Sequence, residues 1–397
     1  MDRQQTQFVF LNLGHFFDHL LPLVFATVAA VTLYQEWGMT YDKLALYAMP
    51  GILAFGLGAL PAGWLADRWS REGMMLIFFL GIGASAVATA FARTPIEIAV
   101  GLFAVGLFGA IYHPVGLAMV IQGRQRTGLP LAVNGIFGNL GVACAALFAG
   151  FLIDFSGWRA AFIWPGTATL LVGLAYAVFL LAGRRLTGSA SLFSAQGETS
   201  GGAQFSHRLL IRILAVVFFS TAIGGLIFQC TTFALPKVMH ERLAEMAVSA
   251  SQVGWYVFVV FACASVGQLI VGFMVDRWSL KRIFLGIALF QVGFFLLMIG
   301  QSGVSALVIA IAFMLVVFGQ IPINDVLIGR VTKTNWRSRV LAIRYVITFS
   351  IGMTSVPIIA LVYAHLGFDE LFMILAGLAV LIFSAVAFLP RASSPAT

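Results

Sequence analysis

Two stretches of this chain, GWLADRWSR at residues 63–71 and GFMVDRWSL at residues 272–280, repeat one pattern at an offset of 209 residues. Each holds a glycine that is followed, after three residues, by Asp-Arg-Trp-Ser. A second match, LAVN at 131–134 against LAIR at 341–344, has an offset of 210 residues. Two matches at nearly the same offset indicate an internal duplication, so the sequence predicts two similar halves.

The amino-acid composition of the whole chain indicates the class of protein. Of 397 residues, 61% are hydrophobic and only 10% are charged, whereas soluble domains carry roughly 25% charged residues. The composition therefore excludes a soluble globular enzyme, and the long apolar runs exclude a disordered chain. Continuous runs near 20 residues also differ from the short alternating strands of an outer-membrane barrel. The remaining class is an all-α polytopic membrane protein.

Twelve apolar segments are each long enough to cross a bilayer as a helix. They span residues 8–32, 43–66, 74–92, 95–122, 130–154, 159–182, 209–235, 249–275, 283–301, 304–330, 339–363 and 368–390. A Gly-, Ser- and Arg-rich stretch at 183–208 separates the sixth helix from the seventh and is typical of a linker loop. The sequence thus predicts 12 transmembrane helices in two pseudo-symmetric six-helix bundles, residues 1–182 and 209–397.

The positions of the basic residues predict the orientation. With the N-terminus in the cytoplasm, 17 of the 23 Lys and Arg residues fall on the inner side, five fall outside, and Arg344 lies within a helix. This bias follows the positive-inside rule and predicts a multi-pass protein of the inner (cytoplasmic) membrane with both termini cytoplasmic. The net charge of +8 is then a sign of topology, and no nucleic-acid partner is expected.

The two copies of the repeated loop are candidate gating elements. An acidic residue after the second helix of each half can cap the next helix or pair with a basic residue when the cytoplasmic side closes. The glycine allows two helices to approach closely. The alternative is that the loop only anchors the topology. The residues concerned are Gly63, Asp67, Arg68 and Arg71 in the first copy, and Gly272, Asp276 and Arg277 in the second.

These loops resemble the Gly-x-x-x-Asp-Arg-x-Gly-Arg-basic signature of the major facilitator superfamily. The first copy departs from it at Ser70, where the family has glycine, and at Glu72, where a basic residue is usual. The resemblance covers the whole chain and implies a transporter whose central cavity is lined by the first, fourth, seventh and tenth helices.

Three shorter motifs resemble the fosmidomycin-resistance-like branch of efflux proteins: GHFFDHL at 14–20, Tyr112-His113-Pro114, and NGIFGNLG at 134–141. This resemblance implies export. The fifth-helix antiporter signature Gly-Pro-x-x-Gly-Gly is not present in the sequence, which weakens the case for drug/proton exchange.

Polar residues inside the predicted helices are candidates for function, because each ionisable one costs about 2.5–3.5 kcal/mol on insertion scales. In the first helix Asn12, His15, Asp18 and His19 share one face by their i, i+3 and i+4 spacing. A His–Asp pair suits proton coupling or substrate contact. Alternatively, the group is a hydrogen-bonded cluster with a purely structural role. A third possibility is a transition-metal site, since His-x-x-x-His with a carboxylate can chelate a metal ion.

Later helices add further candidates. His113 precedes a proline, which frees a backbone carbonyl one turn earlier. Arg344 is either a snorkelling interface residue or a buried cation that pairs with Asp325 or binds an anionic substrate through bidentate hydrogen bonds. Weaker candidates for lining the substrate cavity are Asn12, Asn134, Gln229, Gln320 and Asn324.

The sequence predicts a secondary active transporter that moves a small organic solute by alternating access, is coupled to protons, and acts as a monomer in the bilayer. No G-x-x-x-x-G-K-[ST] sequence is present, so ATP hydrolysis and cofactors are not expected. One alternative is a transporter of metals or metallophores that uses the first-helix His/Asp group. A membrane-embedded enzyme is disfavoured because GHFFDH lacks the glutamate of H-E-x-x-H, and a sensor is disfavoured because no signalling domain is apparent.

Overall fold

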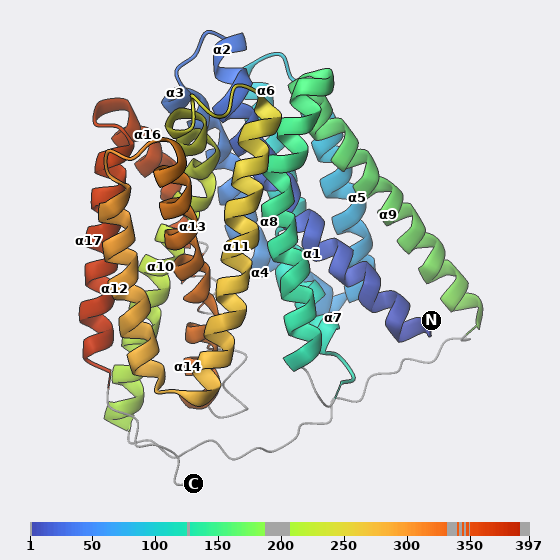
Figure 1. Cartoon of the computed structure of the whole chain (residues 1–397). Helices are drawn as coiled ribbons and strands as arrows, with labels where there is room; N and C mark the ends of the chain where they lie inside the picture. The colour runs from blue at the N-terminus through green and yellow to red at the C-terminus, as the bar shows by residue number, and fades with distance from the viewer. Residues whose placement is uncertain are drawn as a thin grey trace. The chain divides into compact units, whose positions relative to one another are not determined.

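The computed structural model describes residues 2–124, 128–186, 207–331, 340, 344, 347–348 and 350–389. All regular secondary structure in these residues is helical (Figure 1). Eleven helices in the described part of the chain are long and apolar enough to cross a membrane. Each of them overlaps one of the twelve predicted spans. The first half of the other predicted span, 339–363, lies partly outside the described residues, and its described end is the shorter apolar helix Ser350–His365.

The chain divides into two compact units. The first comprises Met1–Gly197 with Ala247–Phe258, and the second comprises Glu198–Met246 with Val259–Thr397. Most of the predicted linker 183–208 lies outside the described residues, which resume at 207.

The helices of the first unit, in chain order, are α1 (Arg3–Val28), η1 (Ala29–Leu33), α2 (Tyr34–Glu36), α3 (Tyr41–Ala45), η2 (Leu46–Ala48), α4 (Met49–Arg68), α5 (Arg71–Thr89), α6 (Pro95–Gly109), η3 (Tyr112–Gly116), α7 (Leu117–Ile121), α8 (Gly128–Ser156) and α9 (Trp158–Leu186). Those that follow are α10 (His207–Arg242), α11 (Ala250–Arg277), α12 (Leu280–Met298), α13 (Gly303–Gly319), α14 (Ile321–Val331), α16 (Ser355–His365) and α17 (Phe368–Ala387).

Local sequence explains where several helices begin. The Asp2 carboxylate accepts the Gln5 N–H at 2.7 Å, and the Gln5 side chain accepts the Asp2 N–H at 3.1 Å, so a capping box starts α1. Ser70 caps α5 by accepting the Gly73 N–H at 3.0 Å. These bonds satisfy backbone donors that no helical carbonyl reaches.

Small residues allow close helix contacts in the first unit, in which α1 packs against α8 and α4 packs against α6. A Cβ added at Gly106 of α6 would lie 1.9 Å from the Gly51 carbonyl oxygen of α4, so only glycine fits there. Such small-residue contacts are typical of helix packing in lipid.

The first turns of α11 also belong to this unit. The Asp154 carboxylate, near the end of α8, accepts the N–H groups of Ala250 at 3.2 Å and Ser251 at 2.7 Å. A carboxylate at the start of a helix is favoured by the free N–H groups and by the helix dipole.

The fourth membrane span, Pro95–Ile121, is not one regular helix. Its α-helical turns stop at Gly109 and resume at Leu117, and the five residues of η3 between them form a π-helix. Pro114 lies within η3 and has no N–H to donate, which explains an irregular turn at this point. The irregular turn carries the side chains of Tyr112 and His113.

Candidate functional site

The polar face predicted for the first helix is buried in the first unit. Asn12 is 5% exposed, His15 is 7% exposed and Asp18 is 1% exposed. Three polar side chains at i, i+3 and i+6 thus lie on the face of α1 that is turned into the protein. Buried polar groups require hydrogen-bond partners, and the neighbouring helices supply most of them.

His15 is oriented by helix α8. Its Nδ1 lies 2.7 Å from the backbone carbonyl oxygen of Asn134. A carbonyl oxygen only accepts, so Nδ1 carries the hydrogen and donates it. In the neutral ring, Nε2 then holds a lone pair, and it lies 3.2 Å from Nε2 of His19.

Tyr112 and Asn134 join three helices by hydrogen bonds. The Tyr112 hydroxyl donates to the carbonyl oxygen of Leu11 at 2.8 Å and accepts from Nδ2 of Asn134 at 2.9 Å. The same amide donates to Oδ1 of Asn12 at 3.0 Å. The Tyr112 ring also stacks on His15, with centroids 4.9 Å apart. The network fixes the ring of His15 in place.

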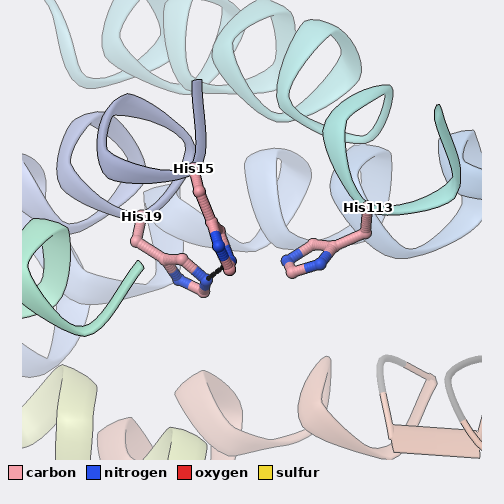
Figure 2. A group of neighbouring side chains, drawn as sticks. All are labelled: His15, His19 and His113. Atoms are coloured by element: carbon pink, nitrogen blue, oxygen red, sulfur yellow. Dashed lines mark hydrogen bonds between the residues drawn. The ribbon is translucent and has the colours of Figure 1, made fainter. Parts of the chain in front are cut away.

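His113 completes a cluster with the histidines of α1. Figure 2 shows the rings of His15, His19 and His113 turned toward one another. One ring nitrogen of each lies within 4.8 Å of those of the other two. The predictions singled out these residues separately, in the first and fourth helices, and the structure brings them together.

The Asp18 carboxylate adjoins this histidine cluster. Its Oδ2 lies 3.3 Å from Nε2 of His113. Among the described residues, no donor reaches either Asp18 oxygen with hydrogen-bond geometry. Burying a carboxylate without such bonds costs several kcal/mol, unless the group binds a proton or lies beside a positive charge.

Glycines of α8 provide the space for the two histidines of α1. A Cβ at Gly138 would lie 2.7 Å from Nε2 of His15, and one at Gly141 would lie 3.2 Å from Cβ of His19. Both distances are shorter than the usual 3.5–4.0 Å contact between carbon atoms. The glycine spacing of NGIFGNLG is therefore explained by the close approach of α1 to α8.

The second unit contains a neutral polar network instead. Gln291 donates to Oε1 of Gln320 at 2.9 Å, and Gln320 donates to the Ser220 carbonyl oxygen at 3.4 Å. The Ser220 hydroxyl lies 3.4 Å from Oδ1 of Asn324. All four side chains are at most 4% exposed. Of the predicted residues, the structure thus brings Gln320 and Asn324 together.

Arg344 is buried in the second unit, with 7% of its surface exposed. Gln229 is half-buried, and its side chain lies within 3.0 Å of the position that a Cβ on Gly352 would take. The side chain of Asp325 lies outside the described part of the chain, so the predicted pairing of Asp325 with Arg344 stays a prediction.

The first loop motif forms an ion pair within its own turn. Asp67 and Arg71 lie 2.9 Å apart, and their side chains are 68% and 39% exposed. Such an exposed pair contributes about 0–1 kcal/mol. The cap of the following helix is supplied by Ser70. Gly63 faces Pro114, and a Cβ there would lie 3.2 Å from the proline ring.

The second loop motif has different surroundings. A Cβ at Gly272 would meet nothing within 4 Å among the described residues. The guanidinium of Arg277 lies over the ring of Phe273, 3.4 Å from its centroid, and that of Arg68 lies over Trp64 at 4.4 Å. The Asp276 side chain lies outside the described part, so the gating role of both motifs stays a prediction.

Two residues that contribute to these sites, Gln291 and Gly138, are not among the predicted site residues. Gln291 is 1% exposed and was hidden in an otherwise apolar helix, where an isolated glutamine is itself a signal. Gly138 was noted only for its spacing. Outside these sites, Lys237 of α10 is also buried, with 4% of its surface exposed, and it pairs with Glu241 at 3.4 Å. No local pattern signals its burial.

Comparison with known proteins identifies the family. The model of the Major Facilitator Superfamily matches residues 11–242 and 217–397. The chain belongs to the Major Facilitator Superfamily. It is thus a multi-pass membrane protein of a transporter family and not an enzyme.

Curated relatives within the superfamily carry names that refer to small organic acids. The chain is 24% identical over 282 residues to the gallate transporter of Pseudomonas putida, covering 64% of this chain and 62% of that protein. It is 24% identical over 310 residues to the 4-hydroxybenzoate transporter PcaK of the same species, covering 69% and 66%. A match to the niacin transporter NiaP of Acinetobacter baylyi is 29% identical over 165 residues, 41% and 37% of the two chains. The chain therefore spans less than two thirds of the length of these relatives.

Solved structures of the superfamily share the fold. A bacterial homolog of the human lysosomal transporter Spinster, in an inward-facing and unoccupied conformation, matches with a TM-score of 0.73 and 14% identity, covering 98% of this chain and 95% of that one. The D-xylose-proton symporter matches with a TM-score of 0.73 and 14% identity, covering 97% of each chain. At this identity the similarity shows the fold alone.

Proposed function

We propose that this superfamily member is a secondary active transporter that moves a small organic acid by alternating access of its two six-helix halves, coupled to protons. The observation that carries the coupling is the buried cluster of Asp18 with the three histidines. Asp18 is 1% exposed, and His113 lies 3.3 Å from its carboxylate. Groups of this kind inside a membrane helix bundle are typical of proton relays.

The cluster supplies the chemistry that coupling requires. Asp18 binds and releases a proton, and His113 is the neighbour with which it exchanges one. Imidazole and carboxylate groups both accept and release protons, which a relay inside a membrane helix bundle requires. Because Asp18 has no hydrogen-bond donor in good geometry among the described residues, a proton there removes an uncompensated negative charge.

The proposed substrate class is a small carboxylate. The three relatives named above transport, by their names, gallate, 4-hydroxybenzoate and niacin, all of which are carboxylic acids. Arg344 is a buried guanidinium in the second unit, and its planar fork suits a carboxylate through two parallel hydrogen bonds. We propose that Arg344 binds the acid group of the solute, with Gln229, Gln320 and Asn324 as neutral neighbours.

The proposed direction of transport is export, and the proposed location is the inner membrane with both termini cytoplasmic. The motifs that resemble an efflux branch favour export. The bias of basic residues supports an inner-membrane location with cytoplasmic termini. The loop motif at Asp67 then lies on the cytoplasmic side, where it contributes to gating.

The coupling is tested with purified protein in proteoliposomes that carry a pH gradient and a lumenal pH indicator, with radiolabelled 4-hydroxybenzoate and nicotinate as probes. Asp18→Asn is expected to abolish gradient-driven accumulation while solute exchange at equal pH continues. Asp42→Asn, at the partly exposed start of α3, is the control and retains both. Wild-type accumulation and lumenal pH change in Asp18→Asn would show that Asp18 is not the proton carrier.

The substrate class is tested by thermal unfolding, since a ligand at 100 times its Kd stabilises by about 2.7 kcal/mol. Carboxylates are expected to raise the unfolding temperature of the wild type, whereas their uncharged amides do not. Arg344→Gln should lose the shift in unfolding temperature. Arg344→Lys should keep a part of it, because lysine retains the charge but cannot form the two parallel hydrogen bonds of a guanidinium. An undiminished shift in Arg344→Gln contradicts the anion site.

A further inference from the structure

We infer that His15, His19 and His113 form a binding site for a divalent transition-metal ion of the Co²⁺ to Zn²⁺ group. Imidazole nitrogen is a preferred ligand of these ions, whereas Mg²⁺ and Ca²⁺ prefer oxygen. The inference goes beyond the proposed function, because it concerns equilibrium binding and holds whichever ion drives transport.

The geometry of the three rings is close to that of a metal site. On a tetrahedral ion with bonds of about 2.0–2.1 Å, two ligand nitrogens lie about 3.3–3.4 Å apart. Nε2 of His15 and Nε2 of His19 are already 3.2 Å apart. All three ligand atoms lie within 4.8 Å of one another, so the widest pair has to close by about 1.5 Å or less. Figure 2 shows the rings converging on one point from α1 and η3.

The hydrogen bonds around His15 prepare it as a ligand. A metal-bound histidine usually donates its other ring N–H to a carbonyl or carboxylate, which fixes the tautomer. Nδ1 of His15 donates to the Asn134 carbonyl oxygen at 2.7 Å, so the lone pair of neutral His15 is on Nε2, inside the cluster. The ring is also held by its stacking on Tyr112.

Metal binding requires the ring proton of His19 to change position, and neither His15 nor His19 has to lose a proton. With His15 Nε2 as acceptor, neutral His19 donates its Nε2 hydrogen across the 3.2 Å contact. An ion placed between the two atoms displaces that hydrogen, and neutral His19 then carries its proton on Nδ1. Both rings stay neutral, and both Nε2 lone pairs point at the metal.

Asp18 supplies the negative charge that a buried divalent cation needs. Its carboxylate is 3.3 Å from Nε2 of His113, and buried charges are stable only when they are paired or bound to a metal. Carboxylates that support a metal-bound histidine typically raise metal affinity 10–100-fold. Three neutral imidazoles beside one buried carboxylate thus match the charge and the ligand preference of this ion class.

The test is a titration of the purified full-length chain with Co²⁺ in detergent, followed by the visible absorption bands that report its coordination. We expect one Co²⁺ per chain at micromolar concentration, displaced by Zn²⁺ and unaffected by excess Mg²⁺. His15→Ala, His19→Ala and His113→Ala should each lose the bands, and Asp18→Asn should bind about 10–100-fold more weakly. His365→Ala, at the exposed end of α16, is the matched control and should bind as the wild type does.

A gain-of-signal variant keeps the test decisive if an alanine variant misfolds. His113→Cys replaces one imidazole with a thiolate ligand and should add an intense sulfur-to-Co²⁺ charge-transfer band, which a purely structural role for His113 would not produce. The inference is overturned if the wild type binds no Co²⁺ stoichiometrically, or if binding persists unchanged in all three alanine variants. Because no transport is measured, either result is independent of the proposed transport function.

Discussion

Replacing Gly138 with alanine changes the site without removing any polar group. The new Cβ would lie 2.7 Å from Nε2, 2.8 Å from Cε1 and 2.9 Å from Cδ2 of His15. Normal contacts require about 3.5 Å or more, so the ring has to withdraw by close to 1 Å. Its bond to the Asn134 carbonyl and its stacking on Tyr112 oppose that movement. The substitution therefore acts directly on the position of His15.

The magnitude follows from two opposing terms. Overpacking of this kind costs about 1–3 kcal/mol, while alanine in place of glycine within a helix gains about 0.5–1 kcal/mol. Gly135, one turn earlier in α8, is the matched control, because a Cβ there meets nothing within 4 Å in the described part of the chain. Gly135→Ala therefore gains the stability of alanine within a helix and has no overpacking cost. The difference in unfolding free energy between the two variants is therefore the overpacking term alone, about 1–3 kcal/mol.

Two assays check the reasoning. Denaturant titration of both variants in detergent gives the difference in stability, and gradient-driven accumulation of 4-hydroxybenzoate or nicotinate in proteoliposomes gives the effect on the site. Gly138→Ala should be the less stable variant and should lose accumulation, while Gly135→Ala keeps it. If the two variants are equally stable and equally active, the packing of His15 against α8 is not as the structure has it.

Two further predictions concern the same unit. In a double-mutant cycle, Tyr112→Phe and Asn134→Ala should show a coupling energy of about 0.6 kcal/mol, the average for hydrogen bonds between membrane helices, and at most about 1.7 kcal/mol. Additive losses would mean that the 2.9 Å contact contributes nothing. Gly106→Ala should destabilise by more than 3 kcal/mol or prevent folding, because its Cβ would lie 1.9 Å from the rigid backbone oxygen of Gly51. Gly293→Ala, where a Cβ meets nothing within 4 Å among the described residues, is the control and should unfold at or above the wild-type temperature.

The membrane helices could be predicted from the sequence because the physical signal is strong. A bilayer requires a continuous apolar run, and eleven described helices coincide with predicted runs. Irregularities within a span carry a weaker signal. Pro114 predicted that the fourth helix would be disturbed, but a π-turn and a simple kink satisfy the same backbone groups, and the choice depends on neighbouring helices.

The site was predicted only in part, because contacts between distant segments have no local pattern. The spacing of His15 and Asp18 placed both on one face of a helix, since helical geometry alone determines that. That His113 would meet them depends on how α1 and η3 pack, which spacing does not encode. The backbone carbonyl of Asn134, which orients His15, was equally invisible, because any residue has such a carbonyl.

The two compact units carry different polar side chains beside a corresponding proline. Pro322 follows Pro114 by 208 residues, and the tenth span is interrupted beside it, between α13 and α14, as the fourth is interrupted at η3. The backbone irregularity is thus shared. The side chains beside it differ, since the first unit has histidines and a carboxylate there and the second has the amides of Gln320 and Asn324.

This division has a consequence for transport. A proton relay requires titratable groups, whereas neutral amides with one guanidinium suit the recognition of an acid. If the halves are specialised in this way, substitutions around Gln320 change the affinity for the solute and leave the response to pH intact, while substitutions around Asp18 do the reverse. Each unit then contributes a different part of the coupled cycle that we propose.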